Sequence, residues 1–182
     1  TVSPHTSRML AEKHAEAGSA YVGAPVFARP DGIASKQASF VVSGPAKAVD
    51  HAALFLEPSA SGIFRFGEDP GAGNVVKLCG NFMIASAIES IGETLSLAEN
   101  NGVDRNQVMD MLGSTIFDCL IYKGYGERVG RRIHMPDARF GLELGLKDVA
   151  LVCDTAHKAG VPMPFASTLH DRLLAAKSRG RG

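Results

Sequence analysis

The stretch GAGNVVKLCGNFMIASAI runs from Gly71 to Ile88 and contains a single charged residue, Lys77. Its apolar residues recur at intervals of three and four, which is the spacing of one face of an α-helix. No strong turn signal follows before Asn100, because an isolated glycine weakens a helix by only about 1 kcal/mol relative to alanine. The sequence therefore predicts one long buried helix, and it raises the question of why a lysine lies alone inside it.

Before residue 70 the pattern alternates between helix and strand, as in part of an α/β sheet. Ser3 is a suitable N-cap for a first helix that starts at Pro4 and stops at Gly18. Pro45 opens a second, amphipathic helix, and a loop is expected at 29–32. Three short apolar runs predict strands near residues 20–27, 39–44 and 62–67.

After residue 70 only helices are expected. Asp104 is a suitable N-cap for the helix that follows the long one, and Pro164 begins the last. Residues 117–132 are ambiguous, with helix breaks expected at two glycines, and 140–158 has helical periodicity. The predicted class is α+β, with a small sheet domain in 1–69 and an all-α domain, built around the long buried helix, in 70–182.

Composition limits the classes of protein. Apolar residues make up 45% of the 182 and charged residues 21%, as in a water-soluble globular protein. Nineteen basic residues balance nineteen acidic ones, which argues against a nucleic-acid partner. Three widely spaced cysteines without a C-x-x-C favour reduced thiols in a cytoplasmic protein. The longest apolar run, 78–91, is too short to predict a membrane span.

A dinucleotide-binding motif is not present. Gly71 and Gly73 follow a predicted strand and open a helix, but the third glycine position is Val76. No second strand with an acidic residue follows about 20 positions later, because that region is still helical.

Lys77 admits two interpretations from the residues alone. It shares a helix face with Gly73, Gly80 and Asn81, where the bare glycines allow another backbone or a ligand to approach. Lys77 and Asn81, one turn apart, can then reach the same small molecule. In the alternative, the lysine extends its ammonium to solvent from an apolar surface and the asparagine is satisfied internally.

Four ordered segments resemble the β-hydroxyacid dehydrogenases, the family of 3-hydroxyisobutyrate dehydrogenase, tartronate semialdehyde reductase and, more distantly, 6-phosphogluconate dehydrogenase. GAGNVVKLCGN resembles the motif G-x-G-x-x-x-K-x-x-N-N, and FGLELGLKDVAL is similar to F-x-x-x-L-x-x-K-D-L. TVSPHTSRMLAEKHAEAG resembles an S-T-x-x-P helix start, and AYVGAPVFARPDGIASKQASFVVSG occupies the place of the D-A-P-V-S-G-G substrate segment.

The resemblance implies a Rossmann domain that binds NAD or NADP, followed by an all-α domain that forms a homodimer. Residues 1–69 would be the last strands of the Rossmann sheet. The chain would then be a piece of a longer protein that lacks the G-x-G-x-x-G half, and alone it would be inactive.

The resemblance also assigns roles. Lys77 corresponds to the general acid/base, Asn81 to a substrate-binding residue, and Lys147 and Thr1 to residues that contact the cofactor. A lysine with its ordinary pKa of about 10.4 is a poor base at pH 7, and apolar surroundings lower that pKa. The resemblance implies that the partner is a small molecule, a hydroxy acid or a related carbonyl compound, with hydride exchanged between its carbinol carbon and the nicotinamide.

Two departures from the family pattern concern the substrate. Gly80 replaces the first asparagine of the motif, and Phe27, Ala28 and Arg29 replace the Ser-Gly-Gly that receives the substrate carboxylate. Phe27 suggests a bulkier or less polar substrate. Arg29 is suited to bind a carboxylate through two hydrogen bonds, although a surface arginine fits equally well.

Two other functions remain open. One is a non-catalytic dimerisation module. The other is a relative of the imine reductases, although these typically replace the catalytic lysine, so its presence favours alcohol and carbonyl chemistry. No metal site is predicted, because the six histidines, including His134 and His157, lack ligand spacing.

Overall fold

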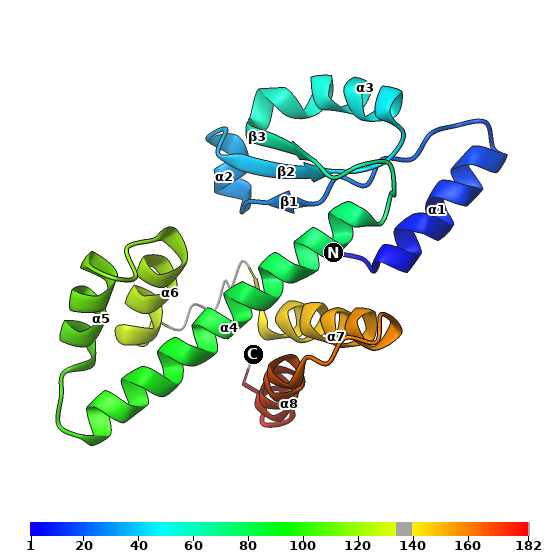
Figure 1. Ribbon diagram of the computed structural model, residues 1–182. Coiled ribbons are helices and arrows are strands. Elements are labelled where there is room, and N and C mark those ends of the chain that lie inside the picture. Colours follow the sequence, from blue (N-terminus) through cyan, green and yellow to red (C-terminus); the bar gives the residue numbers. More distant parts are fainter. Residues whose placement is uncertain (134–139, 182) are drawn as a thin grey trace. The chain divides into compact units, whose positions relative to one another are not determined.

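The computed structural model describes residues 1–133 and 140–181 (Figure 1). The chain divides into two compact units, one of residues 1–80 and 150–162, the other of residues 81–149 and 163–182. His134 lies outside the described residues. The division into domains 1–69 and 70–182 stays a prediction. The compact units are a different division, whose first boundary lies inside the long helix, after Gly80.

The first unit contains a three-stranded sheet in the order β1-β2-β3. β1 is antiparallel to β2, and β2 is parallel to β3, with Phe27 opposite Ser39 in the register. The connection from β2 to β3 runs through α3, which covers one face of the sheet (Figure 1). β1 (Val26–Phe27) and β2 (Ala38–Val42) are shorter than predicted, whereas β3 (Ala60–Arg65) has the predicted length but begins two residues earlier.

The core of this unit lies between the sheet and α3 (Ala46–Leu56). It is formed by Ala38, Phe40 and Val42 of β2 and Val49 of α3, all of them buried. These residues alternate along β2 because successive side chains of a strand point to opposite faces. A 3-10 turn, Glu57–Ser59, connects α3 to β3.

The first helix starts at its predicted cap. α1 (Pro4–Glu16) begins where Ser3 Oγ accepts a hydrogen bond of 3.0 Å from the amide of Thr6. It stops before Gly18, whose φ of +71° suits glycine. The loop predicted at 29–32 is wrong, because residues Pro30–Ala34 form a short helix, α2, with proline in its first turn.

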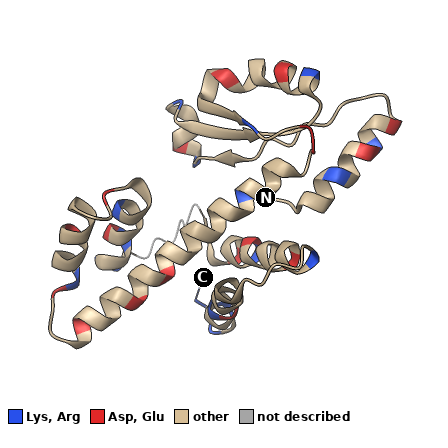
Figure 2. Ribbon diagram, viewed as in Figure 1, with Lys and Arg blue, Asp and Glu red and all other residues tan. Residues whose placement is uncertain are grey.

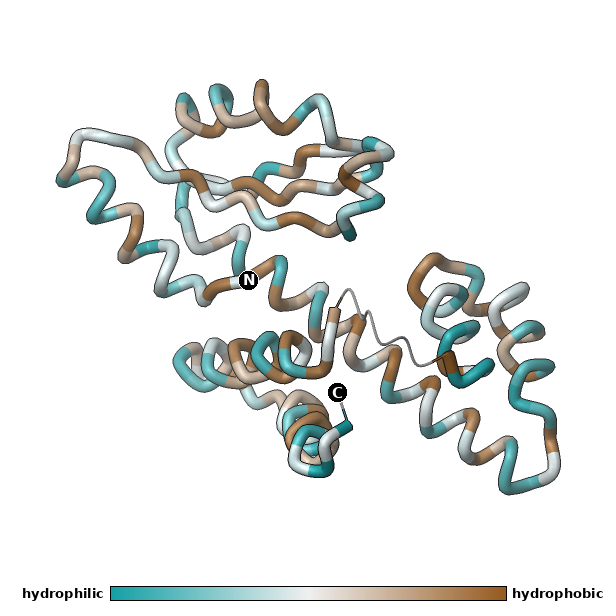
Figure 3. Tube along the Cα trace, turned by 180° about the vertical axis from the view of Figure 1, so that it is seen from behind, coloured by the Kyte–Doolittle hydropathy of each residue, from teal (hydrophilic) through white to brown (hydrophobic). Residues whose placement is uncertain are grey.

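The long helix predicted from the opening stretch is present as α4 (Ala72–Asn100). In the single chain it is much less buried than predicted, and Met83 and Leu97 are each 69% exposed. By length and by its hydropathy of 1.3, α4 is the one candidate membrane span in the described residues, with 17% of that window buried. A core helix of a soluble protein passes the same test, so this is weak evidence. Figure 3 shows apolar segments recurring along α4.

The second unit consists of helices only in its described residues. Ile91 and Leu95 of α4 pack against Met109 of α5, with residues of α6 around them. Asp104 caps α5 as predicted, accepting from the amides of Asn106 and Gln107 at 2.9 Å each. The other helices are α5 (Arg105–Ser114), α6 (Leu120–Gly130), α8 (Pro164–Ser178) and the first part of α7 (Leu142–Lys158), whose residues from Ala150 onward belong to the first unit.

The helix breaks predicted at Gly124 and Gly126 are wrong, because α6 continues through both. Gly126 has a packing role instead. A Cβ at this position would overlap the terminal methyl of Met109, so the glycine leaves room for this side chain between α5 and α6.

Candidate functional site

Lys77 is the one basic residue of α4, and the acidic residues of this helix lie further along it (Figure 2). Its side chain is half-buried in the first compact unit. The ammonium Nζ lies 4.1 Å from the centroid of the Phe27 ring, within the range of a cation–π interaction. The structure therefore brings together two of the predicted site residues that are far apart in the sequence.

Gly80 is in contact with the same ring. A Cβ built on Gly80 would lie closer than 3.0 Å to Cε1 and Cζ of Phe27. No residue with a side chain fits at position 80 unless the ring moves. The two departures from the family pattern, at positions 27 and 80, are thus neighbours in space.

The other glycine of the predicted Lys77 face is covered by the protein itself. The amide of Gly73 donates a hydrogen bond of 3.0 Å to Ser43 Oγ, and a Cβ at Gly73 would lie 3.2 Å from the Val41 carbonyl oxygen. Of the two possibilities raised for this glycine, close approach of backbone or of a ligand, the structure shows the first. Gly73 allows α4 to pack closely against the end of β2.

The beginning of the chain is held against the first turn of α4. The buried Asn74 accepts a hydrogen bond of 2.7 Å from Ser7 Oγ and donates one of 3.3 Å to the Val2 carbonyl oxygen. Thr1 is exposed and directly precedes Val2. The predicted cofactor-contacting threonine is therefore tethered through Asn74, three residues before Lys77 on the same helix.

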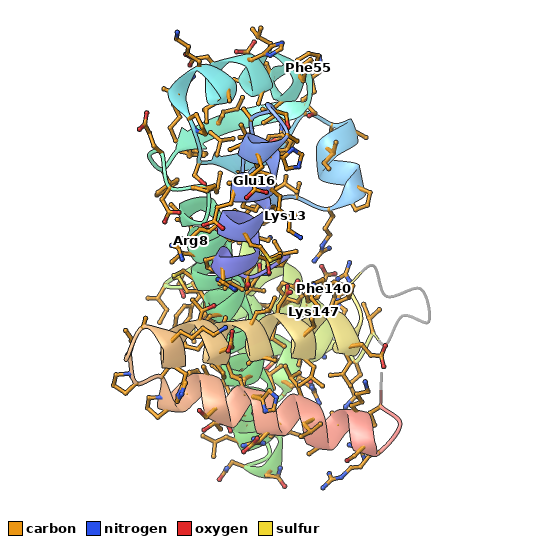
Figure 4. All side chains as sticks on the ribbon, turned by 90° about the vertical axis from the view of Figure 1, so that its right-hand side faces the viewer. Arg8, Lys13, Glu16, Phe55, Phe140 and Lys147 are labelled. Carbon is orange, nitrogen blue, oxygen red and sulfur yellow. The ribbon has the colours of Figure 1, made fainter. Side chains whose placement is uncertain are left out.

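An ion pair anchors the N-terminus of α4. Asp69 accepts hydrogen bonds from Arg8 Nε at 2.9 Å and from the Gly71 amide at 2.9 Å, and Arg8 extends from α1 (Figure 4). The hydrogen bond from Arg8 holds the pKa of Asp69 below its usual value, against partial burial, which raises it. The same pairing raises the pKa of Arg8.

The second unit contains the other predicted polar residues. Asn81 Nδ2 donates a hydrogen bond of 2.6 Å to Asp148 Oδ2, and Lys147 Nζ lies 3.2 Å from Asp148 Oδ1. The Asp148 side chain is only 4% exposed, whereas that of Lys147 is 46% exposed. Figure 4 shows Lys147 on α7. One buried carboxylate thus connects the predicted substrate residue and the predicted cofactor residue.

Asp148 was absent from the predicted site. The signal that could have found it is its place directly after Lys147, in the segment that resembles F-x-x-x-L-x-x-K-D-L. A carboxylate next to a lysine on a helix normally faces solvent, so burial was needed to recognise its role.

The remaining predicted residues lie in the segment after β1. Ala28 is exposed, and Arg29 is half-buried at the N-cap position of α2, where its carbonyl oxygen accepts from the Ile33 amide at 3.1 Å. Among residues 1–133 and 140–181, no group of three or more His, Cys, Asp and Glu side chains is placed to hold a metal ion.

Comparison with known proteins gives one matching family model, described as NAD-binding of NADP-dependent 3-hydroxyisobutyrate dehydrogenase, over residues 71–182. An uncharacterized oxidoreductase of Bacillus subtilis, YfjR, is 30% identical over the whole chain, which covers 63% of that protein. An L-threonate dehydrogenase of Cupriavidus necator is 26% identical, with 100% of this chain and 61% of the relative covered.

The crystal structure of a 3-hydroxyisobutyrate dehydrogenase from Salmonella typhimurium has a TM-score of 0.90 at 24% identity, over 100% of this chain and 63% of that one. This likeness shows the fold. The chain spans about three fifths of the length of these two relatives.

Proposed function

The chain belongs to the family of NADP-dependent 3-hydroxyisobutyrate dehydrogenases, and on this basis we propose that the whole protein is an NAD- or NADP-dependent oxidoreductase. Its substrate is a hydroxy acid or the related carbonyl compound. The nicotinamide accepts or supplies the hydride at the carbinol carbon. Lys77 exchanges the proton of the substrate oxygen, taking it during oxidation and returning it during reduction.

The observation that carries the proposal is the setting of Lys77. It is the lone basic residue in a largely apolar stretch of helix, half-buried, with its ammonium facing an aromatic ring. A lysine that serves only as a solvated surface charge has its ammonium surrounded by water instead. A proton-transferring lysine requires a fixed position and limited water.

Asn81 and Lys147 have supporting roles in the proposal. Asn81 binds the substrate, and its amide is oriented by Asp148. The exposed ammonium of Lys147 has the chemistry needed to bind a cofactor phosphate, and Asp148 restrains it. Thr1, held near the start of α4, contacts the cofactor. We also propose that Ala28 and Arg29, which follow Phe27, line the path of the substrate.

We further propose that the whole protein is a cytoplasmic homodimer that associates through its helical domain. The dimer is supported by the apolar residues that the second unit leaves exposed. Examples are Met83 and Leu97 of α4, at 69% each, and Leu120 of α6, at 86%. The cytoplasmic location rests on the cysteine pattern alone.

The test of the proposed function is turnover by the full-length protein and its Lys77→Ala variant, with NAD and NADP and a panel of hydroxy acids. We expect Lys77→Ala to lower kcat by about 10²- to 10⁴-fold with little change in melting temperature. Lys77→Arg should fail nearly as badly, because arginine stays protonated at neutral pH.

The matched control is Lys13→Ala, which removes an exposed lysine of α1 (Figure 4) and should keep full activity. If Lys77→Ala retains wild-type activity or unfolds the protein, the catalytic assignment is wrong. A full-length protein that dimerises but oxidises no hydroxy acid would favour the non-catalytic dimerisation module.

A further inference from the structure

Phe27 and Gly80, two residues that depart from the family pattern, are in direct contact. The Phe27 ring fills the position where a side chain at residue 80 would lie, since a Cβ there would overlap Cε1 and Cζ. The glycine is therefore what allows the ring to lie against α4. The ring can keep this position only while residue 80 has no side chain.

The same ring borders the ammonium of Lys77. Nζ lies 4.1 Å from the ring centroid, and Lys77 and Gly80 are three residues apart on α4, hence on one face of the helix. Phe27 is the last residue of β1, and its backbone is held by the pairing with Ser39. All of these residues belong to one compact unit.

The apolar surface formed by the Phe27 ring over Gly80, called the apolar wall below, differs in chemistry from the family pattern. The resemblance places a serine near position 27 and an asparagine at position 80, and both carry groups that donate and accept hydrogen bonds. Here a hydrocarbon ring replaces both side chains. A hydroxyl that approaches the ring loses its water without gaining a partner, whereas a methyl or larger hydrocarbon group gains contact.

We propose that Phe27 and Gly80 form one specificity element, which selects hydroxy acids with a hydrocarbon group near the carbinol carbon over polyhydroxylated acids. The inference rests on the proposed function, in which Lys77 acts on the substrate oxygen. An apolar wall discriminates only moderately against an added hydroxyl, and we expect a preference of about 10- to 100-fold in kcat/KM.

The experiment compares four full-length proteins: wild type, Phe27→Ser, Gly80→Asn and the double variant that restores the family residues. The probes are 3-hydroxyisobutyrate, which carries a methyl group, and L-threonate, which carries additional hydroxyls. Wild type should favour the first. The double variant should move the ratio of the two kcat/KM values at least tenfold toward L-threonate.

Two further readouts separate specificity from structure. Gly80→Asn alone should lower the melting temperature because its side chain meets the ring, and adding Phe27→Ser should restore it. Phe27→Leu keeps an apolar wall, so it should preserve the substrate preference that Phe27→Ser loses.

The possible failures differ from one another. If wild type turns over neither probe nor any other hydroxy acid, the proposed function fails and this inference with it. If wild type is active and the ratio stays within twofold in all variants, only the specificity element is wrong. Independent, additive effects of the two substitutions on melting temperature would also overturn it.

Discussion

The amide of Asn81 donates a hydrogen bond of 2.6 Å to Oδ2 of Asp148, a carboxylate that is almost fully buried and whose other oxygen lies 3.2 Å from the ammonium of Lys147. This one carboxylate accepts a hydrogen bond from a residue of α4 and forms an ion pair with its neighbour on α7. Buried carboxylates persist when they are paired, and removal of such a group leaves its donors without an acceptor.

Replacement of Asp148 should therefore affect both stability and activity. We expect Asp148→Ala to reduce the free energy of unfolding by about 1–3 kcal/mol and to lower kcat/KM, because Asn81 loses its acceptor and Lys147 its ion-pair partner. Asp148→Asn should be milder, since an amide oxygen still accepts from Asn81. Urea denaturation and steady-state kinetics measure the two effects.

The control for this prediction is Asp154→Asn, on the same helix. Asp154 forms an exposed i,i+4 ion pair with Lys158 at 2.9 Å, which contributes at most a few tenths of a kcal/mol. Equal losses of stability for the variants at Asp148 and Asp154 would contradict the positioning role of Asp148.

Lys147→Ala should weaken the binding of the nicotinamide cofactor and leave the binding of the hydroxy acid nearly unchanged. The loss of one charge-assisted hydrogen bond to a phosphate is expected to raise the KM for the cofactor about tenfold, while the KM for the hydroxy acid stays nearly constant. Lys158→Ala, which removes an exposed lysine near the other end of α7, should change neither constant. A change confined to the KM of the hydroxy acid would assign Lys147 to the substrate instead.

Gly73 and Gly92 form a matched pair for a test of packing within α4. A Cβ at Gly73 would lie 3.1 Å from Ser43 Oγ and 3.2 Å from the Val41 carbonyl oxygen, whereas a Cβ at Gly92 would meet nothing within 4 Å. We expect Gly73→Ala to destabilise the protein by about 1–3 kcal/mol through overpacking. Gly92→Ala should stabilise it by up to about 1 kcal/mol, because alanine favours the helix. Thermal or urea unfolding would expose an error if both variants shifted in the same direction.

The ion pair of Arg8 and Asp69 predicts a dependence of stability on pH. The pKa of Asp69 is lowered in the folded chain, first by the hydrogen bond from Arg8, so its contribution is present above about pH 4 and is lost as pH falls through the folded pKa. Arg8 stays protonated throughout this range and adds no pH dependence.

Asp69→Asn tests this sign. Because both side chains are about half exposed, the wild type should exceed the variant by no more than about 1 kcal/mol at pH 7. The difference should shrink as pH falls below about 4, and it should also shrink at high salt. A difference that grows on acidification would show that the carboxylate does not stabilise the fold in its charged form.

The proposed dimer predicts a change of mass when the exposed face of α4 acquires charge. Met83→Lys should leave each folded chain intact, because Met83 is 69% exposed, but should shift the full-length protein from dimer toward monomer. Glu12→Lys, an exposed change on α1, serves as the control. Sedimentation velocity would contradict the proposal if wild type is monomeric at high concentration.

The sequence by itself determined most of the local elements of this protein, although not α2 or the continuity of α6. Ser3 and Asp104 mark helix starts through hydrogen bonds within one turn, and Pro164 marks one through its fixed φ. The change of apolar period near residue 70 separates the sheet from the helices that follow it. The segments that resemble a known family predicted Lys77 and Asn81 as site residues. Helical spacing predicted that the two share a face, and α4 contains both, four residues apart.

Only the tertiary structure decided which distant residues meet. The contact of Phe27 with Gly80, the buried bond of Asn81 to Asp148 and the exposure of α4 depend on the path of the backbone between elements. Glycines illustrate the reason. Local propensity alone predicts that a glycine destabilises a helix. At Gly80 and Gly126, however, a side chain from a distant part of the sequence occupies the place where a Cβ would lie.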